Sequence, residues 1–206
     1  MARDIFVDTK QLNRIAIELK NLDNQIPGAA SSAVNRTLDF VYTRIGRLVT
    51  QEYAIKVSDV KKTMTKYKAS KTNLYAKIIS KGHTLSLAHF PFSPKKPMTG
   101  GKRRKAKAVK VKIKRQEGYK TIKTNPLPFV ASTGARSADK TQFNVFKREG
   151  SSRLPIKVLR TLSIPQMITN VNVSDQIQKL AQEKLMERIQ HEIEWRLDKA
   201  AQKVKE

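Results

Sequence analysis

Cysteine is absent from this chain of 206 residues. Disulfides and thiolate metal sites are therefore excluded, and the absence is typical of a protein made in a reducing cytoplasm. Aromatic residues are scarce at 6%, and the apolar share of 39% can build a core but not a large one. A chain of this length fits one domain, or one domain with an inserted arm.

Long apolar runs are missing as well. No window approaches the ~20 apolar residues that a membrane-spanning helix needs. The first residues include Arg3 and Asp4 and show no apolar run of signal-peptide length. We therefore expect a soluble protein of the cytoplasm with no membrane partner.

Acidic residues are the third shortage, because 17 Asp and Glu stand against 42 Lys and Arg, a formal net charge of +25. The imbalance is concentrated between Val60 and Arg148, where 24 basic residues accompany only Glu117 and Asp139. Uncompensated positive charge destabilises a fold through self-repulsion and attracts polyanions. The middle of the chain is therefore expected to meet nucleic acid or a strongly acidic protein surface.

Apolar residues at helical spacing predict a pair of helices over residues 8–50. Asp8 or Thr9 is the expected cap of the first helix, and Pro27 and Gly28 are expected to end it. The second is expected from about Ala29 to Thr50, with small residues at its start that let another backbone approach closely. The two predicted stripes are Leu12, Ile15, Ala16, Leu19 and Leu22, and then Ala30, Ala33, Val34, Leu38, Val41, Ile45 and Leu48.

The central region predicts a short helix followed by strands. Ser58 is a suitable N-cap for a helix over 59–68. Alternating apolar and polar residues then predict a mostly antiparallel sheet over 73–160, with the clearest strand over 109–114, where valines and an isoleucine alternate with lysines. Proline and glycine interleaved with Lys and Arg predict a basic arm over 91–123. Pro155 suits an edge strand or a bulge.

The last helix is expected over residues 174–204, with Ser174 and Asp175 as its capping pair. Its equal numbers of acids and bases are more typical of a structural or subunit-contact helix than of a nucleic-acid reader. The predicted ridge consists of Ile177, Ala181, Leu185, Ile189 and Ile193, broadened by Leu180, Trp195, Leu197 and Ala200.

Together these elements predict an α+β fold in a single domain, residues 1–206. It has an N-terminal helical pair, a central mostly antiparallel sheet with a basic arm, and a long C-terminal helix.

Catalytic chemistry finds little support in the residue pattern. His83 and His89 lie in a basic region with no carboxylate near them in sequence, and His191 lacks a second ligand one turn away. Acidic residues cluster only in the last helix, where ion pairing with Lys184 and Arg188 is the ordinary explanation. A nuclease would need acids beside its DNA-binding charge. We therefore expect no enzyme, no cofactor and no metal.

Contact with phosphates is the stronger physical case. Lysine outnumbers arginine in the basic middle, and lysine acts as a point charge rather than as a bidentate reader of bases. Binding would therefore depend steeply on salt and little on sequence. The same charge would also suit a solvated or protein-facing surface. The candidate residues for contact with DNA or an acidic partner are Lys95, Lys96, Lys102, Arg103, Arg104, Lys105, Lys107, Lys110, Lys112, Lys114 and Arg115.

Several collinear stretches over residues 25–200 resemble the minor tail protein Z family of lambda-like tailed phages and prophages. The Lys-rich segment around 95–123 is more basic than that family pattern. The stretches are Ala33-Val-Asn-Arg36, the region from Arg44 to Arg47, Tyr53-Ala-Ile, Gly82-x-x-Leu-x-Leu-x-x-Phe90, Phe143-Asn-Val-Phe-Lys-Arg148, Arg153-Leu-Pro-Ile156 and Ser163-x-Pro165.

The resemblance implies a structural virion protein at the head-proximal end of the tail, in the neck, assembled in the host cytoplasm. It implies a role in tail completion, head–tail joining and placement of the DNA end, and it transfers no catalytic residues. Implied partners are other copies of the chain in a closed ring, with a hexamer favoured, neighbouring tail terminator, tail tube or head-completion proteins, and packaged double-stranded DNA. The alternative is a free protein that binds nucleic acid without sequence preference.

Overall fold

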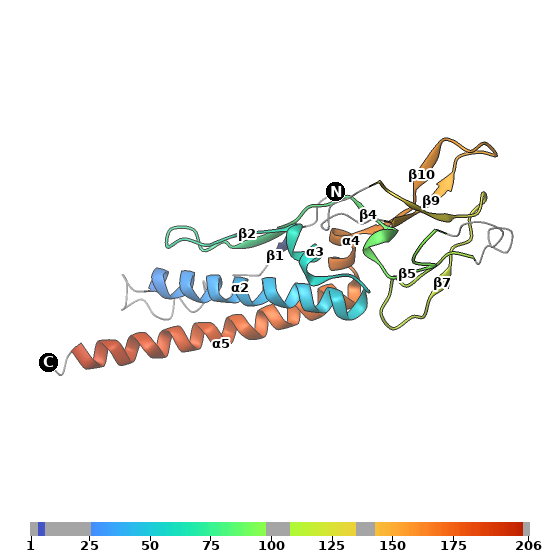
Figure 1. Ribbon diagram of the computed structural model, residues 1–206. Helices are drawn as coiled ribbons and strands as arrows, with labels where there is room; N and C mark the ends of the chain where they lie inside the picture. The colour runs from blue at the N-terminus through green and yellow to red at the C-terminus, as the bar shows by residue number, and fades with distance from the viewer. Residues whose placement is uncertain (1–3, 7–25, 98–107, 135–142, 204–206) are drawn as a thin grey trace. The chain divides into compact units, whose positions relative to one another are not determined.

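The computed structural model describes residues 4–6, 26–97, 108–134 and 143–203 (Figure 1). The chain forms two compact units. Unit 1 comprises residues 1–48, 61–81 and 168–206, and unit 2 comprises residues 49–60 and 82–167. The α+β fold class is confirmed, whereas the single domain over 1–206 stays a prediction.

Unit 1 is built on two long helices that lie side by side, α2 (Ile26–Glu52) and α5 (Val171–Lys203) (Figure 1). The second helix expected from the sequence is confirmed as α2. Its predicted stripe is buried as far as Ile45, which is 0% exposed, while Leu48 is half-buried. The first helix of the expected pair, over residues 8–24, lies outside the described residues.

Three contacts show that α2 and α5 run antiparallel. A Cβ atom on Gly28 would lie 3.4 Å from the Arg196 guanidinium, so the start of α2 meets the C-terminal part of α5. Arg36 pairs with Glu192 at 3.3 Å, and the Lys184 ammonium lies 5.5 Å from the centre of the Phe40 ring. The expected close approach at the small residues that begin α2 is consistent with the burial of Ala29, Ala30 and Ala33.

The long C-terminal helix is confirmed, but it begins three residues earlier than expected. Asn170 is the reason, since its side-chain oxygen accepts a hydrogen bond from the Asn172 N–H at 3.1 Å and its carbonyl accepts those of Val173 and Ser174. These bonds satisfy backbone donors that the start of a helix leaves unpaired. The predicted ridge is buried from Ile177 to Ile189.

A three-stranded antiparallel sheet completes unit 1, in the order β1 (Asp4–Phe6), β3 (Lys77–Ser80) and β2 (Met64–Tyr67). The helix expected over 59–68 is therefore wrong in extent. The observed α3 spans only Val57–Lys62, and the residues after Thr63 pair with β3 instead. Pairing with β3 overrides the local helical preference here. Met64, the first residue of β2, is buried in this arrangement.

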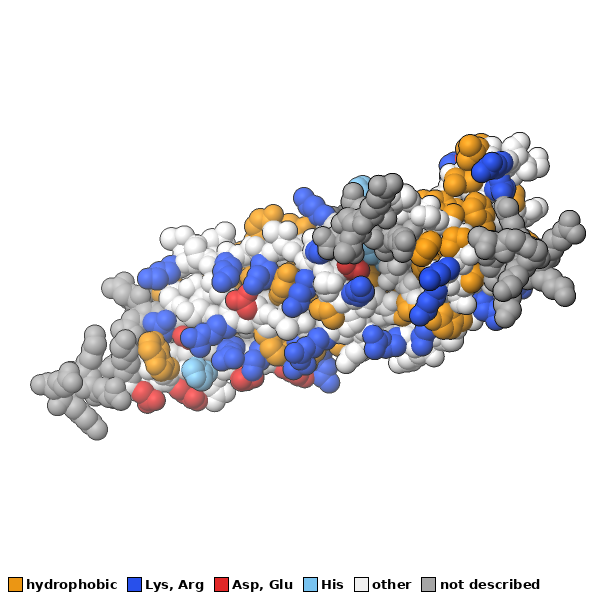
Figure 2. Space-filling view, viewed as in Figure 1, with side chains coloured by type: hydrophobic (Ala, Val, Ile, Leu, Met, Phe, Trp, Pro, Cys, Tyr) orange, Lys and Arg blue, Asp and Glu red, His pale blue; other side chains and the backbone are white. Residues whose placement is uncertain are grey.

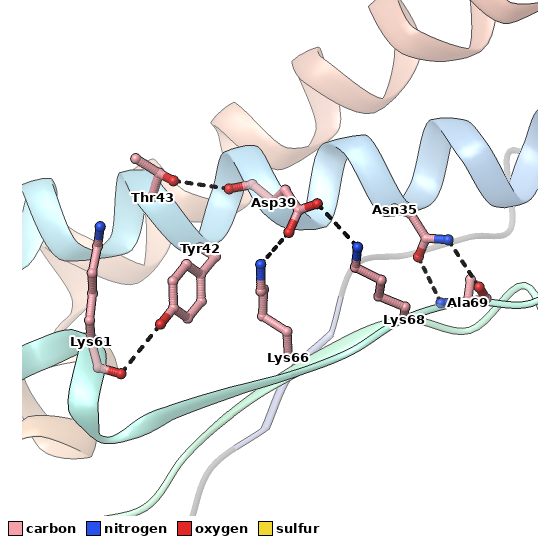
Figure 3. Close-up of polar contacts among 8 residues, drawn as sticks. All are labelled: Asn35, Asp39, Tyr42, Thr43, Lys61, Lys66, Lys68 and Ala69. Carbon is pink, nitrogen blue, oxygen red and sulfur yellow. Dashed lines mark hydrogen bonds and ion pairs between the residues drawn. The ribbon is translucent and has the colours of Figure 1, made fainter.

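Polar contacts fasten β2 to α2 (Figure 3). The Asn35 amide donates to the Ala69 carbonyl at 3.0 Å and accepts from the Ala69 N–H at 2.8 Å. Asp39 accepts a hydrogen bond from Lys66 and pairs with Lys68 at 3.6 Å. Asn35 thus holds the segment just after β2 against α2.

The described residues of unit 2 form three small antiparallel sheets, which confirms the expected mostly antiparallel arrangement. One sheet pairs β4 (Thr84–Ser86) with β11 (Arg160–Ser163). A second has β9 (Phe143–Arg148) between β8 (Phe129–Ser132) and β10 (Ile156–Val158). The third has β6 (Lys110–Val111) between β5 (Phe92–Ser93) and β7 (Lys120–Thr121).

Short helices accompany the sheets of unit 2. The 3-10 helix η1 (Leu87–His89) follows β4, and α4 (Ile164–Ile168) follows β11. Residues 143–148, within the region where the sequence predicts the sheet, form β9, and Val145 at its centre is 0% exposed. Pro155 immediately precedes β10, which lies at the edge of its sheet as expected.

Candidate anion-binding pocket

The central candidate site is a pocket in unit 2, which forms where the residues after α2 meet those after β6. Backbone hydrogen bonds join the two segments, from the Ala54 N–H to the Ile113 carbonyl and from the Arg115 N–H to the Glu52 carbonyl, both at 2.7 Å. Tyr53 and Lys114 form an antiparallel bridge between these bonds. Segments about sixty residues apart in sequence are thereby fixed beside each other.

The residues around η1 supply the third wall of the pocket. The Lys112 N–H donates to the Pro91 carbonyl at 2.9 Å, and Phe92 is the register partner of Val111. The Phe90 N–H donates back to the Leu87 carbonyl at 3.1 Å, which ends η1 and turns the chain toward β5. Each wall is therefore positioned by backbone bonds, which hold it independently of side-chain rotation.

The resulting pocket has a volume of about 480 Å³, within the range of about 300–1,000 Å³ typical of ligand sites. Apolar residues form part of the lining, and Ile55 and Phe90 among them are buried with 5% and 2% of their surface exposed. The remaining lining is basic. The lining consists of Ala54, Ile55, Lys56, Ala88, His89, Phe90, Pro91, Lys112 and Arg115.

The nearby acidic groups are already paired. Glu52 lies 3.8 Å from the Lys114 ammonium, and Glu117 lies 3.5 Å from the same ammonium and 2.5 Å from that of Lys120. The hydrogen bond from Lys120, followed by the charges of Lys120 and Lys114, lowers the pKa of Glu117 below its ordinary value. Glu117 therefore stays ionised and neutralises lysines outside the pocket lining.

Three cations of the pocket have no ion pair within the described parts of the chain. These are Lys56, Lys112 and Arg115, whereas His89 has its Nδ1 atom 3.3 Å from the Asp59 carboxylate. The positive charge around the pocket is thus uncompensated by this unit's own described acids. Such a site favours an anionic group that arrives from outside.

The predicted contact residues lie in different places. Lys112 and Arg115 line the pocket, Lys114 is paired with acids, and Lys110 is exposed on β6. Lys95 and Lys96 are exposed beyond the end of β5. The other candidates, Lys102, Arg103, Arg104, Lys105 and Lys107, lie outside the described residues. Contact of any of these residues with DNA or an acidic partner stays a prediction.

The strand expected over residues 109–114 is wrong in length, because β6 contains only Lys110 and Val111. The chain leaves the ladder with β7 at Lys112, whose N–H bonds to Pro91, and the next residues pair with the segment after α2. Val109 and Val111 are buried as the alternation predicts, but Ile113 is half-buried.

Sequence reasoning missed two members of the pocket, Lys56 and His89. Lys56 lies just outside the most basic stretch, and the pattern around His89 gives only a weak metal signal. Nothing in either local pattern indicates that backbone bonds bring these residues to Lys112. In the portion of the chain that the structure describes, no group of three or more His, Asp or Glu residues could hold a metal ion.

Unit 2, with its small sheets and its cation-lined pocket, is suited to bind an anionic partner within a larger assembly. The chain belongs to the family of prophage minor tail protein Z (GPZ), whose family model matches residues 9–203. It is therefore a structural protein of the phage tail, which implies a non-enzymatic role. No curated protein and no solved structure matches the chain. None of the described helices is long and apolar enough to cross a membrane.

Proposed function

We propose that this tail protein acts at the head-proximal end of the tail, in the neck. There it takes part in tail completion, in joining the tail to the head and in positioning the DNA end. The observation that carries the proposal is the family match over nearly the whole chain, from residue 9 to residue 203. The uncompensated cations of the pocket support it, because a neck component faces densely charged DNA or the acidic surfaces of neighbouring proteins.

The proposed working form is a closed homo-oligomeric ring, with a hexamer favoured. Closed rings arise when a head-to-tail contact between copies returns on itself. The neighbouring partners are tail terminator, tail tube or head-completion proteins, and packaged double-stranded DNA is a further partner.

The experiment that tests the role is a deletion in a prophage that carries this chain. The proposal predicts normal amounts of filled heads and of tails, few joined infectious particles, and restoration by the gene supplied in trans. Abundant infectious particles without the protein would contradict it. A complementing variant with four changes in the arm (Lys102, Arg103, Arg104 and Lys105 to Ala) separates loss of the protein from loss of its charge.

The second candidate is a protein that binds nucleic acid without sequence preference through lysine–phosphate contacts. The three cations of the pocket without a described ion pair favour it. A salt titration of duplex binding identifies the residues involved, because removing one phosphate-binding cation reduces the slope of log K against log salt by about 0.9. If the four-alanine variant keeps the wild-type slope, that arm does not bind DNA.

A further inference from the structure

We propose that the pocket of unit 2 binds a phosphate monoester, the dianionic group found at the 5′ end of a DNA strand and on free nucleotides. The preference for this group follows from the pocket's own residues. Its assignment to a DNA end rests on the proposed function. The two parts are separated by the experiment below.

The amount of charge in the pocket favours a dianion. Lys56, Lys112 and Arg115 bring three positive charges to one pocket, and none has an ion pair in the described parts of the chain. The His89–Asp59 pair is left out of this count, because the carboxylate compensates any charge on the imidazole. A phosphate monoester carries a charge near −2 and three strong acceptor oxygens, so it matches this set better than a carboxylate with a single charge.

The chemistry of the donors also favours phosphate. Arg115 offers a planar fork that matches two oxygens of one phosphate, and Lys56 and Lys112 act as point charges beside it. The three side chains come from two segments whose backbones are joined by bonds of 2.7 Å. Fixed anchoring of the donors lowers the entropy lost when they close on one anion.

The shape of the site favours a terminal phosphate over an internal one. The site is a pocket of about 480 Å³ with an apolar part that includes Ile55, Phe90 and Pro91. A concave site admits a group that protrudes, such as a strand terminus. The phosphates within an intact duplex instead lie along a convex rod, each with a single charge. Among the apolar lining residues, Ala54, Ala88 and Pro91 are accessible and give the attached sugar a surface to pack on.

The test measures binding of the full-length protein to one blunt duplex in two forms, with 5′-phosphate and with 5′-hydroxyl ends, by fluorescence anisotropy at fixed salt. Hydrogen bonds to charged groups contribute about 1.5–3 kcal/mol, so we expect the phosphorylated duplex to bind at least about tenfold more tightly. The double variant Lys112→Gln/Arg115→Gln should bind both duplexes equally. The matched control Lys120→Gln, whose lysine pairs with Glu117 outside the pocket lining, should keep the preference.

Competitors distinguish the sources of the phosphate. A closed circular duplex has no ends and should displace the phosphorylated duplex poorly, whereas dAMP should displace it and inorganic phosphate more weakly. Equal binding of the two duplexes by wild type, with no displacement by dAMP, would overturn the proposal. Equal binding with displacement by dAMP that the double variant loses would keep the phosphate site and overturn its assignment to DNA ends.

The single variants Lys112→Gln and Arg115→Gln guard against misfolding of the double variant. Each should reduce the preference partly while leaving the circular dichroism spectrum unchanged. A preference that both single variants retain in full would overturn the pocket assignment. None of these outcomes depends on whether the protein lies in the neck, so failure here is distinguishable from failure of the proposed function.

Discussion

At the scale of single residues, Glu192 is the side chain whose environment departs most from expectation. The sequence places it among helix acids explained by solvation and surface ion pairing, and Glu183, Glu187 and Glu194 are indeed more accessible than Glu192. Glu192 is only 5% exposed, with Arg36 at 3.3 Å and Arg196 at 3.9 Å. A buried carboxylate is stable only when it is paired, and two guanidinium groups from α2 and α5 provide the compensation here.

We expect Glu192→Ala to lower the free energy of unfolding by about 1–3 kcal/mol, because the mostly buried Arg196 guanidinium loses the carboxylate that compensates its charge. The loss should not exceed this range, because the Arg36 side chain is exposed enough to be solvated by water when its partner is removed. Urea denaturation provides the measurement. Glu183→Ala on the same helix is the matched control and should change stability by less than about 0.5 kcal/mol. Equal effects of the two substitutions would contradict the structural role of Glu192.

Asp39 gives a prediction for pH dependence. The hydrogen bond from Lys66, followed by the charges of Lys66 and Lys68, lowers the pKa of Asp39 below its ordinary value of 3.8. A lowered folded-state pKa means that the stabilisation is fully present above pH 3.8 and is lost as the pH falls through the folded-state pKa. The side chain is 44% exposed, so water and salt screen the interaction.

The expected difference between wild type and Asp39→Asn is therefore less than about 1 kcal/mol at neutral pH, and it should shrink toward zero in acid. Chemical denaturation at several pH values between 6 and 3 measures it. A difference that grows on acidification has the wrong sign for this explanation. Added salt should reduce the difference at pH 6.

At the scale of elements, the sequence predicts long helices better than short strands. Apolar spacing continues over many turns in α2 and α5, so a few irregular positions do not obscure it. In α5 the prediction fails only at single positions. Trp195, predicted to lie on the apolar ridge, is 49% exposed, whereas Glu192 is buried. The strands of unit 2 have only two to six residues, and their limits depend on partners distant in sequence. Lys112, for example, lies just beyond β6 although its N–H donates to the Pro91 carbonyl, because Pro91 has no N–H with which to return a ladder bond.

The packing of α2 against α5 should account for much of the stability of unit 1. Ile177 on α5 is 1% exposed, and we expect Ile177→Ala to cost about 2–5 kcal/mol through reduced burial and the cavity it leaves. Met186, 46% exposed on the same helix, is the control, and Met186→Ala should cost less than about 0.5 kcal/mol. Thermal unfolding followed by circular dichroism distinguishes them. A small effect at Ile177 would show that burial of this face of α5 contributes little to the stability of unit 1.

At the scale of the whole molecule, the basic middle of the sequence does not correspond to one structural body. Its lysines at 61–81 belong to unit 1, whereas the residues from 82 to 148 belong to unit 2. Within unit 1, acidic side chains gather along α5, and basic ones cover the neighbouring α2 and β2 on the face shown in Figure 2. The net charge of the chain therefore favours an anionic partner, but it does not locate the binding site. The pocket forms only where three backbone segments meet, and no local sequence pattern predicts that they do.

A closed ring predicts a defined oligomer in solution or on assembly with its neighbours. Native mass spectrometry of the purified protein should show a species of six times the 23.4 kDa chain in equilibrium with monomer. The six-copy species should gain population as concentration rises, because ring closure depends on protomer concentration. A continuous ladder of ever larger species would instead indicate an open, non-closing contact.

The proposed ring of this protein in the neck of the particle is tested most directly by an electron cryomicroscopy reconstruction of intact virions, without imposed symmetry in the neck. We expect density for copies of this chain in a closed ring between head and tail, with the pocket of unit 2 turned toward DNA or an acidic neighbour. Density for the chain only at the distal tip, or along the tail shaft without a ring at the neck, would contradict the proposal.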